Sequence, residues 1–329
     1  MFKIDPRLSV APMMNWTDRH CRVFHRLLSK NTLLYSEMIT SGAIIYGNRD
    51  RFLAFNEIEH PVALQLGGSC PRELSEASKI GVDYGYDEIN LNLGCPSDRV
   101  QSGCFGAVLM KEPDLVFDCI AEIKKAVTNT KITAKCRLGV DEQDPVAILP
   151  KFLQQLIDAG IDGVVIHARK AILKGLSPKQ NREVPELNYE IVSQMKNEFP
   201  QVEIVINGGI RDLSVANRFI KDGLDGVMIG RAAYRNPYDI LLMADEKIFN
   251  KKVTNKTMKN VLWDFCDYIE DELNKGTRLN EITRHILGAF NGVSGARNFR
   301  QMLSGNAHRP GAGLEIVKAA IEQVADRKS

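Results

Sequence analysis

Cys95 is the residue of this sequence best placed for acid–base chemistry. It directly follows a β-rich run, EINLNLG at 88–94, within NLGCPSDRVQSGCFGAVLM. A thiol of ordinary pKa, about 8.5, is mostly protonated at neutral pH, so this side chain could donate a proton as well as attack an electrophile. Cys104, in the same loop, is a less specific candidate. The alternative is that Cys95 is structural, as most cysteines after strands are.

The cysteines as a set indicate neither a metal site nor a disulfide framework. The chain has seven, with no CxxC pair and no zinc-ligand spacing. Their odd number and scattered positions favour a reducing compartment. No apolar run approaches the ~18 residues needed to span a bilayer, and Lys3, Asp5 and Arg7 interrupt the segment where a signal peptide needs an apolar core. We therefore expect a cytoplasmic protein with no metal and no membrane partner.

Two glycine-containing turns indicate a phosphate site. Asn207-Gly208-Gly209 and Gly230-Arg231 end the seventh and eighth β-rich runs of the chain. Glycine lets backbone N–H groups approach an anion, and the Arg231 guanidinium would add a positive charge. The alternative is a pair of tight turns that need glycine only for positive φ. Their place after the last two strands of a predicted barrel favours phosphate.

Lys135, Gln65 and His167 point to a heterocyclic ligand beside that phosphate. Lys135 ends a buried run, and because a buried lysine is rare unless paired, we expect it to face a negative charge in a ligand. Gln65 and His167 could hydrogen-bond a heterocycle, although each alone could equally be structural. Together with the phosphate turns, the set fits flavin mononucleotide (FMN), with Lys135 near the ring edge that carries charge after reduction.

Eight β-rich runs position these residues. Most are continuous apolar runs, typical of strands buried on both faces of a parallel sheet, and they lie at 8–13, 33–39, 61–67, 88–94, 132–139, 162–169, 202–209 and 225–231. Helical patterns lie between them, as at 145–160, where Pro150 predicts a kink or a later start. The economical fold is a (β/α)₈ TIM barrel, whose active site lies at the carboxyl ends of the strands. A doubly wound open sheet would usually have GxGxxG after its first strand, where this chain has MMNWTD.

The pattern changes after residue 245. Residues 258–276, 282–290 and 314–326 have helical periodicity, with no β-rich run between them. The sequence therefore predicts an α/β barrel domain at 1–245 and a smaller all-helical domain at 246–329, joined near 247–257.

Positive charge is concentrated in two segments. Residues 167–182 contain five Lys or Arg and no acid, and residues 273–313 contain six against one acid. Each segment thus carries +5, so the remainder of a chain whose net charge is +2 carries −8. Either segment alone could be a solvated helix face, but the two together favour a polyanionic partner.

These motifs resemble those of the tRNA-dihydrouridine synthase family, from about residue 7 to the C-terminus. The resemblance rests on SVAPM, ALQLGG, DEINLNLGCPSDRVQSGCFGAVLM, the K-x-R-x-G of 135–139, HARKA, INGGI and GVMIGR. HARKAILKGLSPKQNR, with ITRHILGAFNGVSGARNFRQML, is similar to A-type members, which modify positions 20 and 20a of the tRNA D-loop. One departure is Ile172, where A-type members often have tryptophan. The change weakens an aromatic contact and touches no catalytic role.

The resemblance implies a role for each matching position. Cys95 would be the proton donor. FMN would be held by Ala11, Pro12, Met13, Gln65, Lys135, His167, Asn207, Gly208, Gly209, Gly230 and Arg231. Contacts to tRNA would come from Asn92, Lys179, Arg182, Arg297 and Arg300. The last four lie in the two basic segments that charge counting identifies independently.

The reaction implied by the resemblance is reduction of uridine to dihydrouridine. NADPH would reduce FMN, the reduced flavin would deliver hydride from N5 to C6 of uracil, and Cys95 would protonate C5. A stacked base cannot reach a barrel mouth, so the uridine must be splayed out of the D-loop. We expect a monomer. An FMN barrel acting on a small molecule would leave the basic segments unexplained, and a non-catalytic RNA-binding barrel would leave Cys95 and the flavin residues unexplained.

Overall fold

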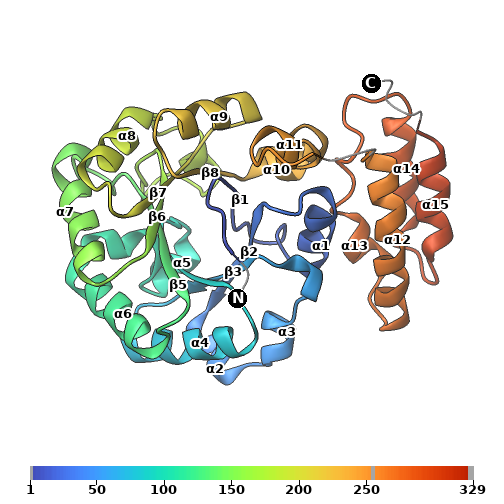
Figure 1. Ribbon diagram of the computed structural model, residues 1–329. Helices are drawn as coiled ribbons and strands as arrows, with labels where there is room; N and C mark the ends of the chain where they lie inside the picture. The colour runs from blue at the N-terminus through green and yellow to red at the C-terminus, as the bar shows by residue number, and fades with distance from the viewer. Residues whose placement is uncertain (1–2, 253–255, 325–329) are drawn as a thin grey trace.

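The computed structural model of this protein describes residues 3–252 and 256–324. Its centre is a closed barrel of eight parallel strands in sequential order, in which the first strand also pairs with the last (Figure 1). The strands are β1 (Leu8–Val10), β2 (Leu33–Thr40), β3 (Val62–Gly67), β4 (Glu88–Leu93), β5 (Lys131–Arg137), β6 (Gly163–His167), β7 (Glu203–Asn207) and β8 (Gly226–Ile229). All eight predicted strands are confirmed, because each apolar run is buried between the barrel interior and the surrounding helices.

Helices surround the barrel and connect successive strands (Figure 1). They are α1 (Arg19–Leu28), α2 (Ser41–Tyr46), α3 (Arg49–Leu53), α4 (Pro71–Asp83), α5 (Asp98–Ser102), α6 (Pro113–Ala126), α7 (Pro145–Asp158), α8 (Tyr189–Glu198), α9 (Leu213–Lys221), α10 (Arg231–Arg235) and α11 (Ala244–Lys247). The expected later start at Pro150 is wrong. Helix α7 begins at Pro145, where the Asp144 carboxylate accepts from the Val146 N–H, and it continues through Pro150.

Four further helices lie beside the barrel, at the right of Figure 1. They are α12 (Met258–Asn274), α13 (Leu279–Thr283), α14 (Ala296–Asn306) and α15 (Leu314–Glu322). Helices α12 and α15 confirm the predicted helices at 258–276 and 314–326, although they end at Asn274 and Glu322, whereas the predicted helix at 282–290 is wrong. Helix α13 ends at Thr283, and turns follow, in which a Cβ at Gly288 would lie 2.6 Å from the Arg235 carbonyl oxygen. Part of the expected junction, residues 253–255, lies outside the described residues. No helix in the described part of the chain is long and apolar enough to cross a membrane.

A buried polar cluster joins the β1–α1 loop to the helical region. Asp18 caps α1 by accepting from the Cys21 N–H, and its carboxylate lies 3.0 Å from His285 Nε2. His285 Nδ1 lies 3.1 Å from the Tyr234 hydroxyl. Burial alone would raise the pKa of Asp18, but the hydrogen bond and charge of His285 outweigh it and hold the pKa well below the ordinary 3.8.

We expect Asp18→Asn to lower the free energy of unfolding by about 2 kcal/mol at neutral pH, because it removes the carboxylate that pairs with the Arg284 guanidinium and contacts the buried His285. Asparagine keeps the helix cap, so the change isolates the charge. Since the folded-state pKa is depressed, this stabilisation is present above pH 3.8 and is lost as the pH falls toward the folded pKa. Urea unfolding at a series of pH values measures the difference. Glu122→Gln, at an exposed pair with Lys125, should change the free energy of unfolding far less, and an equal cost at both sites would contradict the prediction.

Candidate active site

Strand register brings the predicted site residues together at the carboxyl end of the barrel. Asn92 on β4 pairs with Lys135 on β5, and His167 on β6 pairs with Asn207 on β7. The Ala11 N–H, at the end of β1, donates to the carbonyl of Ile229, directly before Gly230. The predicted flavin residues therefore lie around one rim, although their sequence positions span more than two hundred residues.

The turn after β7 requires both of its glycines. Gly208 and Gly209 have φ of 117° and 69°, in the region that favours glycine. A Cβ on Gly208 would lie 2.6 Å from the His167 ring, and one on Gly209 would lie 2.7 Å from Leu187. At Gly230, φ is negative, and a Cβ would lie 3.3 Å from that of Ala11. Gly208 and Gly209 thus serve the turn itself, whereas Gly230 leaves the backbone bare beside the β1 loop.

Arg231 is already paired. Its guanidinium donates to the Glu183 carboxylate at 2.6 Å, and both side chains are partly exposed. The hydrogen bond from Arg231 lowers the pKa of Glu183. A phosphate at this turn would therefore share Arg231 with a carboxylate from the loop between β6 and α8.

Lys135 is a cation without an anion. Its ammonium donates to the Asn207 side-chain oxygen at 3.1 Å, and no carboxylate of the described residues forms an ion pair with it. Burial, and then the charge of Arg137, lowers its pKa from 10.5 to about 8. The ammonium form still predominates at pH 7, so the site presents a positive charge that a ligand could neutralise.

Further cations gather around His167. Burial and then the charges of Arg137, Lys135, Arg169 and Arg182 lower the pKa of His167 well below 6.5, so the imidazole is neutral. Burial, followed by Arg182 and Arg169, lowers that of Arg137 to about 10. The buried Nε of Arg169 has no hydrogen-bond partner among the described residues. An excess of positive charge and an unpaired donor at one rim suit an anionic ligand.

The loop carrying Cys95 is held on both sides. The N–H groups of Gly94 and Cys95 donate to the Asn92 side-chain oxygen at 3.1 and 3.0 Å. The Arg137 guanidinium donates to the Gly94 carbonyl at 3.1 Å. Cys95 is half-buried, whereas Cys104 is exposed and has a positive φ of 54°. The structure thus fixes the backbone of Cys95 and separates it from the second candidate.

The residues predicted to contact tRNA differ in how exposed their side chains are. Lys179, Arg182 and Arg297 are exposed, Arg300 is half-buried, and Asn92 is buried in the barrel mouth. Contacts connect the two basic segments through α10. At the start of α10, Arg231 pairs with Glu183, the residue after Arg182. At the end of α10, the Arg235 carbonyl accepts from the Asn291 side chain. The Asn291 side-chain oxygen accepts from Arg300 at 3.0 Å. The two segments therefore border the same short helix.

Sequence reasoning assigned no role to several groups that complete the site. Arg137 and Arg169 stood at predicted strand ends, and their carbonyl contacts hold the loops after β4 and β6. Glu88 and Asn90 face the barrel interior from β4, with Thr133 beside them on β5. The polar alternation in EINLNL is the signal that could have found this pair, since alternate residues of a barrel strand face inward.

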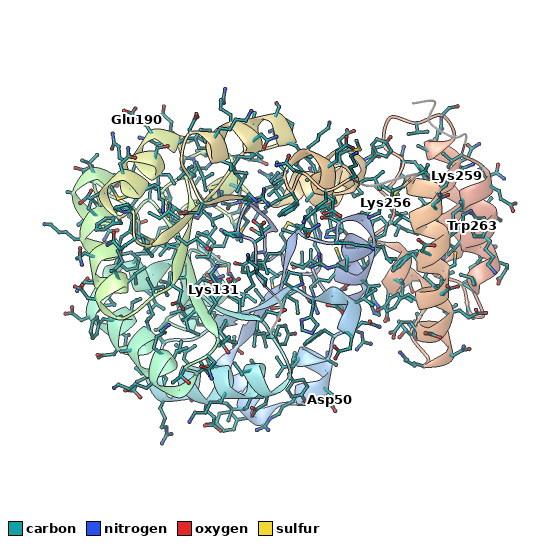
Figure 2. All side chains as sticks on the ribbon, in the orientation of Figure 1. Asp50, Lys131, Glu190, Lys256, Lys259 and Trp263 are labelled. Carbon is teal, nitrogen blue, oxygen red and sulfur yellow. The ribbon has the colours of Figure 1, made fainter. Side chains whose placement is uncertain are left out.

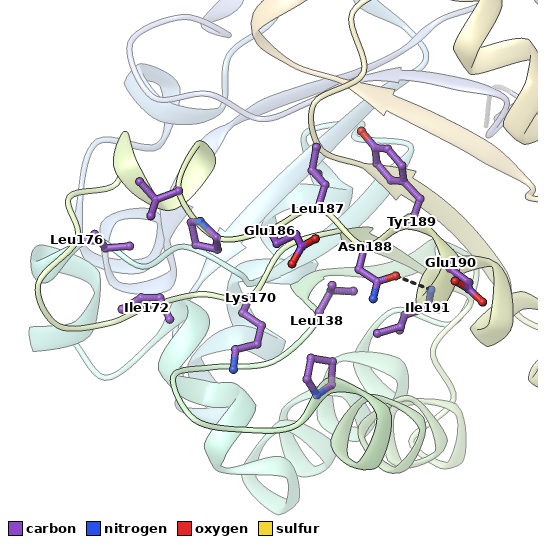
Figure 3. A pocket seen from close by; sticks show the side chains of 13 residues that line it. Leu138, Lys170, Ile172, Leu176, Glu186, Leu187, Asn188, Tyr189, Glu190 and Ile191 are labelled. Atoms are coloured by element: carbon purple, nitrogen blue, oxygen red, sulfur yellow. Dashed lines mark hydrogen bonds between the residues drawn. The ribbon is translucent and has the colours of Figure 1, made fainter.

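A cavity of about 710 Å³ lies outside this rim, between the loops after β5 and β6 and the start of α8 (Figure 3). Leu138, Lys170, Ile172 and Leu187 are among its lining residues, and Asn188 beside it caps α8 through the Ile191 N–H. None of the predicted site residues lines it. Ile172, where A-type members often have tryptophan, borders this cavity.

Within 3–252 and 256–324, no three His, Cys, Asp or Glu side chains gather as ligands for a metal ion. The barrel itself has solved counterparts. An old yellow enzyme homologue from Zymomonas mobilis superposes with a TM-score of 0.54 over 78% of this chain and 92% of that one, at 11% identity. At such low identity the likeness concerns the fold alone.

Sequence comparison is more specific. A sequence model of the family described as dihydrouridine synthase (Dus) matches residues 9–326. Proteins called tRNA-dihydrouridine(20/20a) synthase from Vibrio cholerae and Yersinia pestis are 53% and 52% identical, over 97% of this chain and 96% and 91% of their own lengths. One from Escherichia coli is 50% identical over 98% of this chain and 96% of its own. The chain therefore belongs to the dihydrouridine synthase family.

Proposed function

We propose that this protein reduces uridine to dihydrouridine at positions 20 and 20a of the tRNA D-loop. The observation that carries the proposal is its identity of 50–53%, over nearly the full length of both chains, to proteins with that name. The basic segments of the barrel and helical region support a polyanionic substrate. A small-molecule reductase on the same barrel would need neither segment.

FMN is the cofactor that we assign to the rim, and the residues fit it. Gly208 and Gly209 in the turn after β7, and Gly230 beside Ala11 and Met13, present backbone without a side chain, whose N–H groups can approach a phosphate closely. The Lys135 ammonium, which has no carboxylate partner among the described residues, and the buried Arg169 Nε, which has no hydrogen-bond partner among them, call for an electron-rich ligand. Gln65, His167 and Asn207 supply hydrogen-bonding groups at the same rim, with Arg231 beyond them. The chemistry that bound FMN supplies is hydride donation to uracil C6, with NADPH as its reductant.

The protein's own part in the reaction is proton transfer and charge stabilisation. Cys95 donates its thiol proton to uracil C5, on a loop that Asn92 and Arg137 hold. Lys135 stays protonated below its pKa of about 8 and stabilises negative charge on the ligand. His167 is neutral and can donate one hydrogen bond or accept one.

Binding of tRNA is assigned to both parts of the chain. Lys179 and Arg182 extend from the loop after β6, and Arg297 and Arg300 lie on α14. We assign catalysis to a barrel domain at 1–245 and tRNA binding mainly to a helical domain at 246–329, in a monomer. Together they would hold the D-loop over the barrel mouth with the target base splayed out.

Dihydrouridine formation tests the proposal. Purified protein is incubated with NADPH and with either unmodified tRNA or free uridine. We expect product nucleoside from tRNA at a rate at least ~10³-fold above that from uridine, because the mononucleoside lacks the phosphates that the basic segments bind. Equal rates would favour the small-molecule reductase. A colourless protein that binds no flavin would refute the cofactor assignment.

Lys135→Met should weaken FMN binding by at least ~10-fold and stabilise the flavin-free protein by about 1–2 kcal/mol at pH 7, since it removes a half-buried ammonium that lacks an anion. The folded-state pKa, about 8, lies below the ordinary 10.5, so the unfolded chain binds more protons between these values. Flavin-free wild type should therefore gain stability as the pH rises from 8 to 10.5, and the variant should lack that gain. Thermal unfolding of the flavin-free wild type and of the variant, at a series of pH values across this range, measures the two stability profiles. Identical pH profiles would contradict the prediction.

A further inference from the structure

A continuous chain of hydrogen bonds runs through the barrel interior from the Cys95 loop to a buried carboxylate. Its upper part lies between β3 and β4. The N–H groups of Gly94 and Cys95 donate to Asn92 Oδ1, and Asn92 Nδ2 donates to Gln65 Oε1 at 2.9 Å. Gln65 Nε2 then donates to Asn90 Oδ1 at 2.8 Å. Every bond in this part runs in the same direction.

The lower part continues between β4 and β5 in that direction. Asn90 Nδ2 donates to Thr133 Oγ1 at 2.8 Å, and the Thr133 hydroxyl donates to Glu88 Oε1 at 2.5 Å. The Tyr35 hydroxyl donates to the same oxygen at 2.6 Å. Burial and then the charge of Glu88 raise the pKa of Tyr35 well above its ordinary value, so its proton stays on the hydroxyl. The chain therefore ends on an oxygen that accepts two protonated donors.

Strand register and burial account for this arrangement. Gln65 and Thr133 pair with Asn90 from either side, and Glu88 and Asn92 lie two residues away from Asn90 on β4, on the same face. Gln65, Glu88, Asn90 and Thr133 are each at most 2% exposed, so water does not compete for their polar atoms. The other interior cluster of the barrel is largely apolar and includes Ala63, Val165 and Val205. The polar side chains thus have one another as partners, except that Glu88 Oε2 accepts no hydrogen bond from the described residues.

The direction of the chain is fixed from both ends. Backbone N–H groups can only donate, so Asn92 must turn its oxygen toward Gly94 and Cys95. At the other end, a carboxylate can only accept, and the second oxygen of Glu88 faces the Lys131 ammonium at 3.7 Å. Figure 2 shows Lys131 toward the middle of the barrel. Only one orientation of each intervening amide satisfies both ends.

The direction of the chain decides whether Gln65 and Asn92 offer hydrogen-bond donors or acceptors to the site. The amide oxygens of Gln65, Asn90 and Asn92 each accept from inside the protein, whereas Gln65 Nε2 and Asn92 Nδ2 each keep a second N–H. We propose that Glu88 is a positioning residue, which acts through Thr133 and Asn90 to make Gln65 and Asn92 face the barrel mouth as hydrogen-bond donors. The inference rests on the proposed function, in which Gln65 contacts the flavin and Asn92 the tRNA.

Two pairs of variants test the proposal. Thr133→Val removes the hydroxyl in the middle of the chain at nearly constant volume, and Thr133→Ser restores it. In Glu88→Gln, the amide oxygen would face Lys131 and the NH₂ group would turn toward Thr133, which reverses the end of the chain. Glu203→Gln is its matched control, because Glu203 pairs with the same Lys131 at 2.7 Å but accepts no bond from the chain.

The first readout is the FMN dissociation constant of flavin-freed protein, from fluorescence quenching. The second is hydrogen exchange of the Cys95 amide in the flavin-free protein. For Thr133→Val and Glu88→Gln we expect FMN binding about tenfold weaker, with a shifted visible flavin spectrum, and about tenfold faster amide exchange. Thr133→Ser and Glu203→Gln should stay within about twofold of wild type in both readouts.

Three outcomes would overturn the proposal. The first is wild-type behaviour of Thr133→Val and Glu88→Gln. The second is equal weakening by Glu88→Gln and Glu203→Gln, which would assign the effect to Lys131. The third is failure of Thr133→Ser to rescue. If wild-type protein binds no FMN, the flavin assignment fails by itself, and exchange of the Cys95 amide still decides whether Glu88 directs the chain.

Discussion

Replacement of Cys95 by alanine is expected to slow tRNA reduction by about 10²–10⁴-fold while leaving FMN bound. The thiol is the acid that we assign to uracil C5, and no other cysteine lies in the loop held by Asn92 and Arg137 except the exposed Cys104. Alanine leaves the backbone bonds of this loop intact, since they involve the N–H and the carbonyl of Cys95 and not its side chain. Single-turnover reduction of tRNA by flavin-reduced protein measures the chemical step directly.

Cys104→Ala is the control for this experiment. Cys104 lies in the same loop but is exposed, so its removal should change the single-turnover rate by less than about twofold. An unchanged rate in Cys95→Ala would refute the role of the thiol. Loss of bound FMN in that variant would indicate that Cys95 supports the flavin site and would contradict the assignment equally.

The second large effect is expected from changing Lys179, Arg182, Arg297 and Arg300 together to alanine. We expect kcat/KM for tRNA to fall by about 10³-fold or more, whereas oxidation of NADPH by the bound flavin should continue at the wild-type rate. Lys179, Arg182 and Arg297 are exposed and Arg300 is half-buried, and we assign all four side chains to tRNA binding and not to the flavin. Because we assign these side chains to phosphate contacts, the slope of log affinity against log salt should become shallower by about 3.

A second variant, which loses four positive charges elsewhere on the surface, distinguishes the effect of their position from the effect of net charge. Arg72, Lys79, Lys151 and Lys221 are exposed on the outer helices α4, α7 and α9, and their change to alanine removes the same net charge. We expect this variant to keep at least about half of the wild-type activity on tRNA. Equal losses in both variants would show a general electrostatic effect, and loss of NADPH oxidation in the first would indicate a structural role.

The barrel could be predicted from the sequence because its signal is local. Each strand is a short apolar run, such as DGVVIHAR or DGVMIGR, bounded by glycine or polar residues. In a closed parallel barrel all carboxyl ends meet at one rim, so the ends of these runs identified Gln65, Lys135, His167 and Asn207 as neighbours without any knowledge of distances. The roles given to these residues stay predictions.

The features that escaped prediction depend on contacts between distant parts of the chain. Arg231 pairs with Glu183, from a loop 48 residues earlier, and periodicity carries no sign of this. The apolar pattern at 282–290 suggested a helix, but helix α13 ends at Thr283 and turns follow it. Within these turns, Gly288 packs closely on the backbone of Arg235, a contact that the local pattern does not reveal. Glu88 and Asn90 were read as members of a buried strand, and only the register with Gln65 and Thr133 shows that they bond to one another.

Position mapping of dihydrouridine tests the central claim most directly. Unmodified tRNA is treated with the purified protein and NADPH, cut into defined fragments and analysed by mass spectrometry. The account predicts a gain of the mass of two hydrogen atoms per modified uridine, at positions 20 and 20a of the D-loop and at no other uridine. A gain elsewhere in the tRNA, or no gain from protein that holds FMN and oxidises NADPH, would contradict it.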